Sequence, residues 1–329
     1  MTLLNLSFAC ETYDRIRALQ DGRVRPEGID LNIIPLTVEE TFYRQARYRE
    51  FDASEMSLSS YLLTLDLDEP PFVALPVFPS RMFRHQSIYI NKNSGISSPA
   101  DLIGKRVGVP EYQLTAPVWQ RGILAEHYGV PVESVRYFTG GIEQPGRIEK
   151  LKLNLPPEVS VTPIAPDQTL SALLAAGELD AMYAPHNPVG FGSLPQLGRL
   201  FEDFPAVEAD YYRQTGIFPI MHTVVVRRSL YEQHPWIARS LTKAFSAALD
   251  VAYEDLAQRN VLKVMLPWLD RHLSDTIDVL GARYWDYGVE NNRTALETFS
   301  RYSHSQGLTS RPRRAEEIVL ASAGDTFLL

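Results

Sequence analysis

Apolar positions recur along this 329-residue chain with two different spacings. Short, nearly continuous apolar runs are typical of buried strands, and apolar residues three or four positions apart are typical of amphipathic helices. The two patterns alternate through the N-terminal part. They predict strands at 4–10, 29–36, 71–78 and 87–93, helices at 14–22 and 38–51, and a short strand, a serine-rich turn and a helix start within 51–63.

The same alternation continues beyond residue 95. It predicts a short helix, a strand at 106–109, a helix at 115–128, a strand at 135–141, and a helix and strand within 169–185. The run 185–198, rich in Pro and Gly, indicates a connector. A strand from about His222, two helices and a largely helical C-terminal part follow, with an exposed turn at 284–292.

Alternating strands and helices predict α/β architecture, with a mainly parallel sheet and helices on both faces. The order of the elements predicts two doubly wound lobes of this kind. Lobe 1 is expected to contain 1–90 and 205–329, and lobe 2 to contain 91–204. A ligand cleft is expected between the lobes, since the loops at the carboxyl ends of strands bind ligands in such folds.

Composition narrows the function. The formal net charge of −8 argues against a general nucleic-acid binder, which needs a basic face. The single cysteine, Cys10, excludes an intramolecular disulfide and a cysteine metal site. The sequence contains no run of about 20 apolar residues, so we expect no membrane span. No basic residue precedes Arg15 and the first apolar run is short, so we expect a soluble, cytoplasmic protein rather than an exported one.

Polar side chains follow many of the predicted strands, where they would line the cleft. These candidates are Glu11, Glu55, Ser57, Glu111, Tyr112, His186 and His222. Each also has a structural interpretation, because Ser57 or Glu111 could cap the following helix and His222 could be a buried core histidine.

The stretch VFPSRMFRH, residues 77–85, gathers Arg81, Arg84 and His85 beside Phe78 and Phe83. Its position after a strand favours one wall of a cleft for a small anion. No nucleotide-binding, hydrolase or metalloprotease motif occurs, and no histidine pair has metal-ligand spacing. The residue pattern by itself therefore predicts a two-lobed α/β protein that binds a small anionic ligand, and nothing more specific.

Several long strings carry a more specific resemblance. LSFACETYDR, FDASEMSLSSY, PVFPSRMFRH, GVPEYQ, TGIFPIMHTV and HPWIARSL resemble the 4,5-dihydroxyphthalate decarboxylase family, in order, from about residue 4 to beyond residue 300. The resemblance implies the type II periplasmic-binding-protein fold. It also implies loss of one carboxylate from 4,5-dihydroxyphthalate, which gives protocatechuate and carbon dioxide. We expect no cofactor and name no metal ligand, but whether the reaction needs a metal ion stays open at this point.

That chemistry needs a proton donor at the ring carbon, a para hydroxyl as electron sink, and cations for the carboxylate that stays. As hypotheses, His222 and then His85 transfer protons, while Glu11, Glu55 and Glu111 orient a histidine or the hydroxyls. The expected substrate-binding residues are Arg81, Arg84, Ser57, Tyr112, Phe83 and His186.

Two alternatives stay open at this point. One is a solute-binding or sensor protein for an aromatic acid on the same fold, because fold does not determine function. The other is a decarboxylase for a different hydroxylated aromatic acid. The oligomeric state is also open, with a homo-oligomer as one option.

Overall fold

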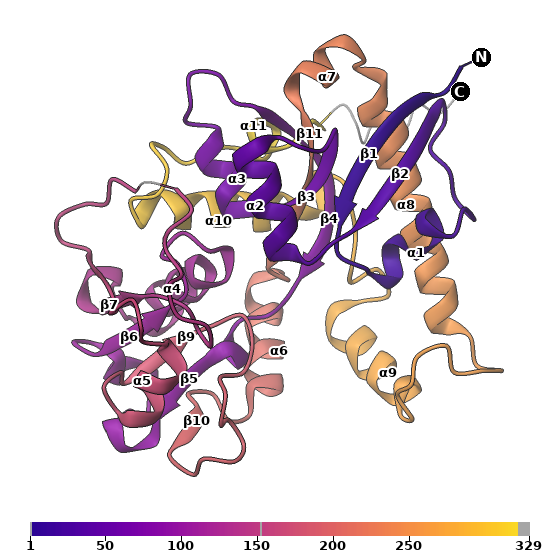
Figure 1. The fold of residues 1–329 in the computed structure, drawn as a ribbon. Helices are drawn as coiled ribbons and strands as arrows, with labels where there is room; N and C mark the ends of the chain where they lie inside the picture. The colour runs from indigo at the N-terminus through magenta and orange to yellow at the C-terminus, as the bar shows by residue number, and fades with distance from the viewer. Residues whose placement is uncertain (1, 152, 322–329) are drawn as a thin grey trace. The chain divides into compact units, whose positions relative to one another are not determined.

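The computed structural model describes residues 2–151 and 153–321, and the chain divides into two compact units (Figure 1). The first unit contains the chain up to Arg81, Ile220–Glu297, and the chain from Arg313; the second contains Met82–Pro219 and Thr298–Pro312. The expected lobe boundaries at 90/91 and 204/205 differ from this division at both crossovers. Lobe 1 was also expected to include Thr298–Pro312, which this division places in the second unit.

The first unit is built on a five-stranded sheet of order β2-β1-β3-β11-β4. Its strands are β1 (Leu4–Cys10), β2 (Ile29–Pro35), β3 (Ala53–Ser57), β4 (Phe72–Arg81) and β11 (Ile220–Arg227). β1 pairs in parallel with β2 and β3, whereas β11 is antiparallel to both β3 and β4. Because β11 is antiparallel to both of its neighbours, β1, β2, β3 and β4 run in one direction and β11 runs against them. The chain leaves the sheet at the carboxyl end of β4 and re-enters it at the same end as β11. For this reason β11 runs antiparallel to β3 and β4, between which it lies.

The first unit also contains several helices. They are α1 (Asp14–Gln20), α2 (Val38–Tyr48), α3 (Leu58–Thr64), α7 (Arg228–Gln233), α8 (Trp236–Ala257), α9 (Leu269–Leu280) and α11 (Ala315–Ile318). The long helix α8 packs against α1 and β4. Phe245 of α8 meets Phe8 of β1 edge to face, at 5.2 Å between ring centroids. Burial of such aromatic rings stabilises the unit mainly through the apolar area removed from water.

β4 departs from regular pairing where the sequence has Pro76 and Pro79, because proline has no N–H to donate to the ladder. Leu75 is paired with Val224, but the next pair along β11 joins His222 to Ser80. Residues 76–79 therefore form a bulge, which we call the β4 bulge.

Other elements bond to the carbonyls in and beside the β4 bulge. Thr223 Oγ1 donates to the Leu75 carbonyl at 3.1 Å. Gly288 N donates to the Pro76 carbonyl at 2.8 Å, and Trp285 Nε1 to that of Phe78 at 3.0 Å. Arg15 Nε donates to the Pro79 carbonyl. The bulge thus exposes acceptors that fix residues from distant parts of the chain.

The segment 284–292 was expected to be an exposed turn, and this is wrong. Tyr287 and Val289 are buried. Asn292 Nδ2 donates to the Asp286 and Gly288 carbonyls, which closes the segment on itself. Gly288 and Trp285 of this segment donate hydrogen bonds to carbonyls of the β4 bulge, and these bonds hold the segment against the sheet.

The second unit contains a six-stranded sheet of order β10-β5-β9-β6-β7-β8. Its strands are β5 (Ile88–Asn91), β6 (Arg106–Val109), β7 (Arg136–Thr139), β8 (Ser160–Pro163), β9 (Ala181–Tyr183) and β10 (Leu197–Arg199). Its main helices are α4 (Thr115–Tyr128), α5 (Leu170–Ala176) and α6 (Phe204–Thr215). β8 and β10 were not predicted, because each is a short edge strand without an apolar run. The two α/β units confirm the predicted fold class.

The last helix, α10 (Arg293–Ser305), carries the chain from the first unit into the second. Tyr302 packs directly on Gly122 of α4, where an added Cβ would lie 2.1 Å from the ring. Trp119 of α4 also contacts the rings of Phe299 and Tyr302. The C-terminal segment therefore completes the core of the second unit.

Candidate functional site

The main group of predicted site residues lies at one edge of the first unit's sheet. Glu11 follows β1, Glu55 lies within β3, Arg81 ends β4 and His222 lies near the start of β11. The β11–β3 register pairs His222 with Ser57 and Val224 with Glu55. Because β11 runs antiparallel to β3, its first residues reach the edge where β3 ends.

Glu55 and His222 form a buried pair. We call this pair, with Tyr13 and the Glu11 amide, the Glu55 site. His222 Nδ1 lies 2.6 Å from Glu55 Oε1, and the Glu55 side chain is 0% exposed. The Tyr13 hydroxyl donates to the same oxygen at 2.7 Å. The backbone N–H of Glu11 donates to Glu55 Oε2 at 3.1 Å. Both carboxylate oxygens are therefore hydrogen-bonded, as a buried charge requires.

The surroundings keep Glu55 ionised. Burial alone would raise the pKa of Glu55, but the charge of His222 and hydrogen bonds from His222, Tyr13 and the Glu11 amide outweigh it, so the pKa is lowered. Burial and then the nearby Glu55 charge raise the pKa of Tyr13 and of the Cys10 thiol. At neutral pH the site thus holds a carboxylate beside a neutral phenol and a neutral thiol.

The imidazole of His222 is held from two sides. Glu55 binds Nδ1, and the ring of Phe42 meets the imidazole edge to face at 4.8 Å. The side chain is 16% exposed, and no described residue hydrogen-bonds to Nε2. A carboxylate behind Nδ1 stabilises a protonated imidazole and fixes its orientation, so Nε2 can give a proton to a bound molecule.

Other predicted residues of the first unit have structural contacts. Arg81 Nη2 donates to the Asp286 carbonyl at 2.9 Å and to Asn292 Oδ1. Ser57 Oγ accepts from the Ser60 N–H at 3.3 Å and so caps α3. The Glu11 side chain accepts from the Thr12 N–H at 2.8 Å.

The remaining residues of VFPSRMFRH belong to the second unit. His85 is 1% exposed, and its ring packs against Phe201, Tyr128 and Tyr211. Neither ring nitrogen has a hydrogen-bond partner among the described residues. Burial, aided by the charge of His127, lowers the pKa of His85 to about 4. This environment favours a neutral packing residue over a proton carrier.

Arg84 and Phe83 are also occupied within the second unit. Burial lowers the pKa of Arg84 to about 10, partly offset by Tyr89 and Glu208, so it stays charged at neutral pH. Phe83 stacks on Phe218 at 4.7 Å. His186 lies on an exposed loop, where Nδ1 is 3.0 Å from the Asn187 carbonyl.

A second charged cluster surrounds Glu111, after β6. The Glu111 side chain is 1% exposed and forms ion pairs with Arg147 at 2.7 Å and Lys150 at 3.2 Å. Tyr112 is buried, and its N–H donates to Glu149. Burial, together with the charge of Glu111, raises the pKa of Glu149 to about 7. Glu111 therefore has its own cations within this unit.

Sequence reasoning assigned no site role to three residues near these groups, namely Tyr13, Arg15 and Glu149. Tyr13 and Arg15 lie in the string ETYDR, directly after the first strand, so their position was an available signal. Glu149 lies in a segment without periodicity, and no sequence signal distinguished it. Its protonation depends on burial, which a sequence does not display.

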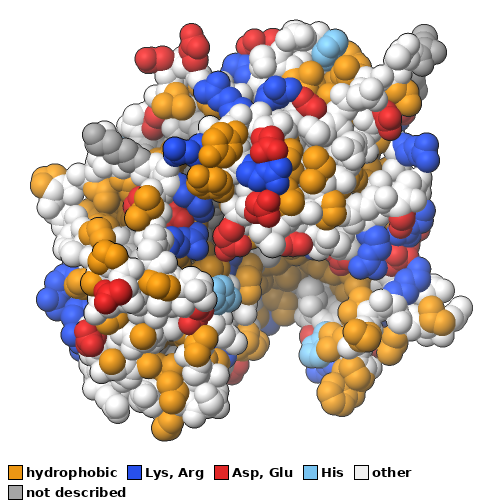
Figure 2. All heavy atoms as spheres, viewed as in Figure 1, with side chains coloured by type: hydrophobic (Ala, Val, Ile, Leu, Met, Phe, Trp, Pro, Cys, Tyr) orange, Lys and Arg blue, Asp and Glu red, His pale blue; other side chains and the backbone are white. Residues whose placement is uncertain are grey.

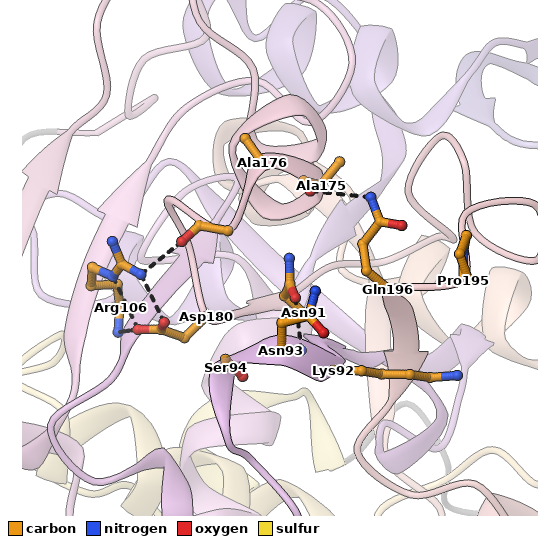
Figure 3. A pocket seen from close by; sticks show the side chains of 11 residues that line it. Asn91, Lys92, Asn93, Ser94, Arg106, Ala175, Ala176, Asp180, Pro195 and Gln196 are labelled. Atoms are coloured by element: carbon orange, nitrogen blue, oxygen red, sulfur yellow. Dashed lines mark hydrogen bonds and ion pairs between the residues drawn. The ribbon is translucent and has the colours of Figure 1, made fainter.

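The described part of the second unit also has a surface pocket of about 770 Å³. It lies where β6 and β9 begin, the edge opposite Glu111 and His186. Figure 3 shows Arg106 paired with Asp180, and Gln196 bonded to the Ala175 carbonyl. The charged pair in this pocket is already formed, and the lining residues include no histidine.

Surface and metal features add little chemistry. On the face drawn in Figure 2, acidic and basic side chains adjoin. Among the ion pairs of the described residues, Arg44 binds both Glu40 and Glu50. Among residues 2–151 and 153–321, no three or more His, Cys, Asp or Glu side chains gather as a metal site would require. In the same residues, no helix has the length and apolar composition that crossing a membrane requires.

Comparison with known proteins separates fold from activity. No protein-family model matches the sequence. A periplasmic sulfonate-binding protein from Methylobacillus flagellatus has a TM-score of 0.51 at 15% identity, over 98% of this chain and 92% of that one. Identity this low shows the fold alone, which is that of the periplasmic binding proteins.

Two curated relatives are much more similar in sequence. The 4,5-dihydroxyphthalate decarboxylase of Comamonas testosteroni is 42% identical over 328 residues, which cover 99% of each chain. The enzyme of the same name from Pseudomonas putida is 46% identical over 214 residues, 65% of this chain and 83% of that one. Identity of this extent, over nearly the whole length, places the chain in the 4,5-dihydroxyphthalate decarboxylase family.

Proposed function

We propose that this protein decarboxylates 4,5-dihydroxyphthalate to protocatechuate and carbon dioxide, with the Glu55–His222 pair as its proton-transfer group. The observation that carries the proposal is the 2.6 Å contact between His222 Nδ1 and the buried Glu55 carboxylate. The names of the two curated relatives support the choice of substrate.

The chemistry follows from the substrate. Protonated His222 gives the proton on Nε2 to the ring carbon that carries the leaving carboxylate. The para hydroxyl loses its proton as the ring becomes a cyclohexadienone. The bond to the carboxylate then breaks, carbon dioxide leaves, and the electron pair restores the aromatic ring. The product regains a proton on that oxygen, and His222 is reprotonated from solvent, so the reaction consumes one proton overall.

Glu55 acts through His222. An ionised carboxylate at Nδ1 stabilises the imidazolium that must be present before the ring is protonated. Tyr13 and the Glu11 N–H hold that carboxylate in place. His85 has no part in this scheme because its ring is packed and neutral. Substrate roles for Arg84, Glu111, Tyr112, Phe83 and His186 stay predictions, as do a cytoplasmic location and the absence of a cofactor.

The test is turnover by the purified protein and by two variants. Wild-type protein incubated with 4,5-dihydroxyphthalate should release protocatechuate and carbon dioxide in equal amounts. His222→Asn should lower kcat by about 10²–10⁴-fold, the usual contribution of proton transfer by a side chain. Glu55→Gln keeps the shape of the side chain but removes its charge, so kcat should also fall, with an altered pH dependence.

The outcomes separate the alternatives. Tight binding of the substrate by wild-type protein without turnover would make the chain a binding protein or sensor. Wild-type turnover together with near-normal kcat in folded His222→Asn would keep the reaction but reject the proton-transfer residue.

A further inference from the structure

Arg15 lies near the Glu55 site. Neither the sequence analysis nor the proposed chemistry gives this residue a role. Its guanidinium lies 4.1 Å from the centroid of the Tyr13 ring and 4.1 Å from that of Trp285. Its Nε donates to the Pro79 carbonyl of the β4 bulge. Two aromatic faces and a fixed carbonyl therefore hold the guanidinium in one orientation.

Arg15 is joined to the Glu55 site through Tyr13. The same tyrosine that covers one face of the guanidinium donates its hydroxyl to Glu55 Oε1 at 2.7 Å. Glu55 in turn binds His222. One side chain thus separates a rigid cation from the proton-transfer pair, and all four residues belong to the first unit.

The outer nitrogens of Arg15 remain available for a ligand. Nη1 donates to Asp14 Oδ1 at 3.0 Å, but the Asp14 side chain is 45% exposed and adjacent in sequence. Such exposed pairs are weak and exchange readily with other anions. Nη2 has no hydrogen-bond partner among the described residues, and the Arg15 side chain is 15% exposed. The fork of Nη1 and Nη2 is the geometry that binds a carboxylate through two parallel hydrogen bonds.

Arg81 is less suited to this task. It is 9% exposed, and it donates to the Asp286 carbonyl and to Asn292 Oδ1. These contacts connect β4 to the segment 284–292, so Arg81 has a structural role that binding a carboxylate would disturb.

We propose that Arg15 binds the carboxylate that stays on the ring and so positions the substrate beside His222. This inference rests on the proposed function. A cation should hold the retained carboxylate rather than the leaving one, because tight binding of the leaving group would stabilise the ground state. Arg15 is then a substrate-binding residue that selects for dicarboxylates.

The experiment uses Arg15→Gln with Arg17→Gln as the matched control, since Arg17 is an exposed residue of the same helix. Binding of two probes is measured by calorimetry or by inhibition: protocatechuate, which keeps the retained carboxylate, and catechol, which has none. Arg15→Gln should raise the KM for 4,5-dihydroxyphthalate and the Kd for protocatechuate at least tenfold. The Kd for catechol and the melting temperature should stay nearly unchanged, and kcat should fall less than KM rises.

Two results would overturn the assignment. In the first, Arg15→Gln binds protocatechuate within twofold of wild type. In the second, the Kd for catechol rises as much as the Kd for protocatechuate, which would mean that Arg15 supports the structure of the site without binding the carboxylate. If wild-type protein does not turn over 4,5-dihydroxyphthalate but binds protocatechuate, the proposed function fails, and the comparison of the two probes still tests Arg15.

Discussion

At the residue scale, similar side chains acquire different roles from their partners. His222 and His85 were both predicted to transfer protons. His222 has a buried carboxylate at Nδ1, whereas the described surroundings of His85 are aromatic rings. A buried carboxylate gives His222 a fixed hydrogen-bond partner, whereas burial among rings lowers the pKa of His85 to about 4 and keeps that ring neutral.

The aromatic environment of His85 predicts how the protein responds to acid. Its pKa of about 4 is below its ordinary 6.5, so the unfolded chain binds this proton first as the pH falls. The stability that neutral His85 contributes is complete above pH 6.5 and is lost toward pH 4. A shift of this size corresponds to about 3 kcal/mol.

His85→Phe should therefore lose less stability than wild type between pH 7 and pH 4.5, while kcat stays within twofold. Urea denaturation at several pH values measures the difference between the two proteins. The difference is the useful quantity because Glu208, whose pKa is raised by burial to about 7, titrates nearby in both proteins. A large loss of kcat in folded His85→Phe would contradict this interpretation and would support a role of His85 in proton transfer.

At the scale of elements, the β4 bulge binds residues from other parts of the chain. Two prolines interrupt pairing, and the carbonyls there bind Arg15, Trp285, Gly288 and Thr223. The irregular strand thus positions side chains that a regular ladder could not hold.

Thr223→Val tests the value of one such contact. Thr223 is 0% exposed, and its hydroxyl donates to the Leu75 carbonyl. Valine has nearly the same shape but leaves that acceptor without this donor, so the free energy of unfolding should fall by about 1–3 kcal/mol. Urea denaturation measures it.

Thr242→Val is the matched control. Thr242 is also buried, but its hydroxyl donates to the Ala238 carbonyl one turn back in α8. That carbonyl has the helical N–H as a second donor, so the loss should be smaller. Equal losses in the two variants would contradict the role of the bulge.

At the scale of the whole molecule, the chain crosses between its units more often than a two-lobe scheme with two crossovers requires. Thr298–Pro312 returns to the second unit after the chain has re-entered the first. There Gln306 Oε1 accepts from Arg121 Nε at 2.8 Å, and its Nε2 donates to the Val118 carbonyl. Residues near the C-terminus therefore satisfy a buried cation in α4.

Gln306→Ala should destabilise the protein by about 3 kcal/mol, because the buried Arg121 guanidinium loses a partner it cannot replace with water. Both residues are at most 1% exposed. Ser305→Ala, one residue earlier and exposed, should change the unfolding free energy little. Thermal denaturation of the two variants checks this, and equal midpoints would refute the argument.

Much of the fold could be read from the sequence. The spacing of apolar residues determined most strands and helices, because burial on one face imposes that spacing directly. It failed for β8 and β10, which are short edge strands, and for 284–292, whose burial depends on the carbonyls of the β4 bulge. The antiparallel direction of β11 depends on where the chain re-enters the sheet, which spacing does not encode.

The site divided in the same way. The sequence by itself determined that Glu11, Glu55 and His222 follow or adjoin strands, and its long strings indicated the family. Only the tertiary structure decided that Glu55 binds His222, 167 positions away, while His85 packs among rings. It also decided that Arg81 bonds to the segment 284–292, whereas no described residue hydrogen-bonds to Nη2 of Arg15. Hydrogen bonds between distant residues follow from strand register and burial, and neither is a property of a local stretch of sequence.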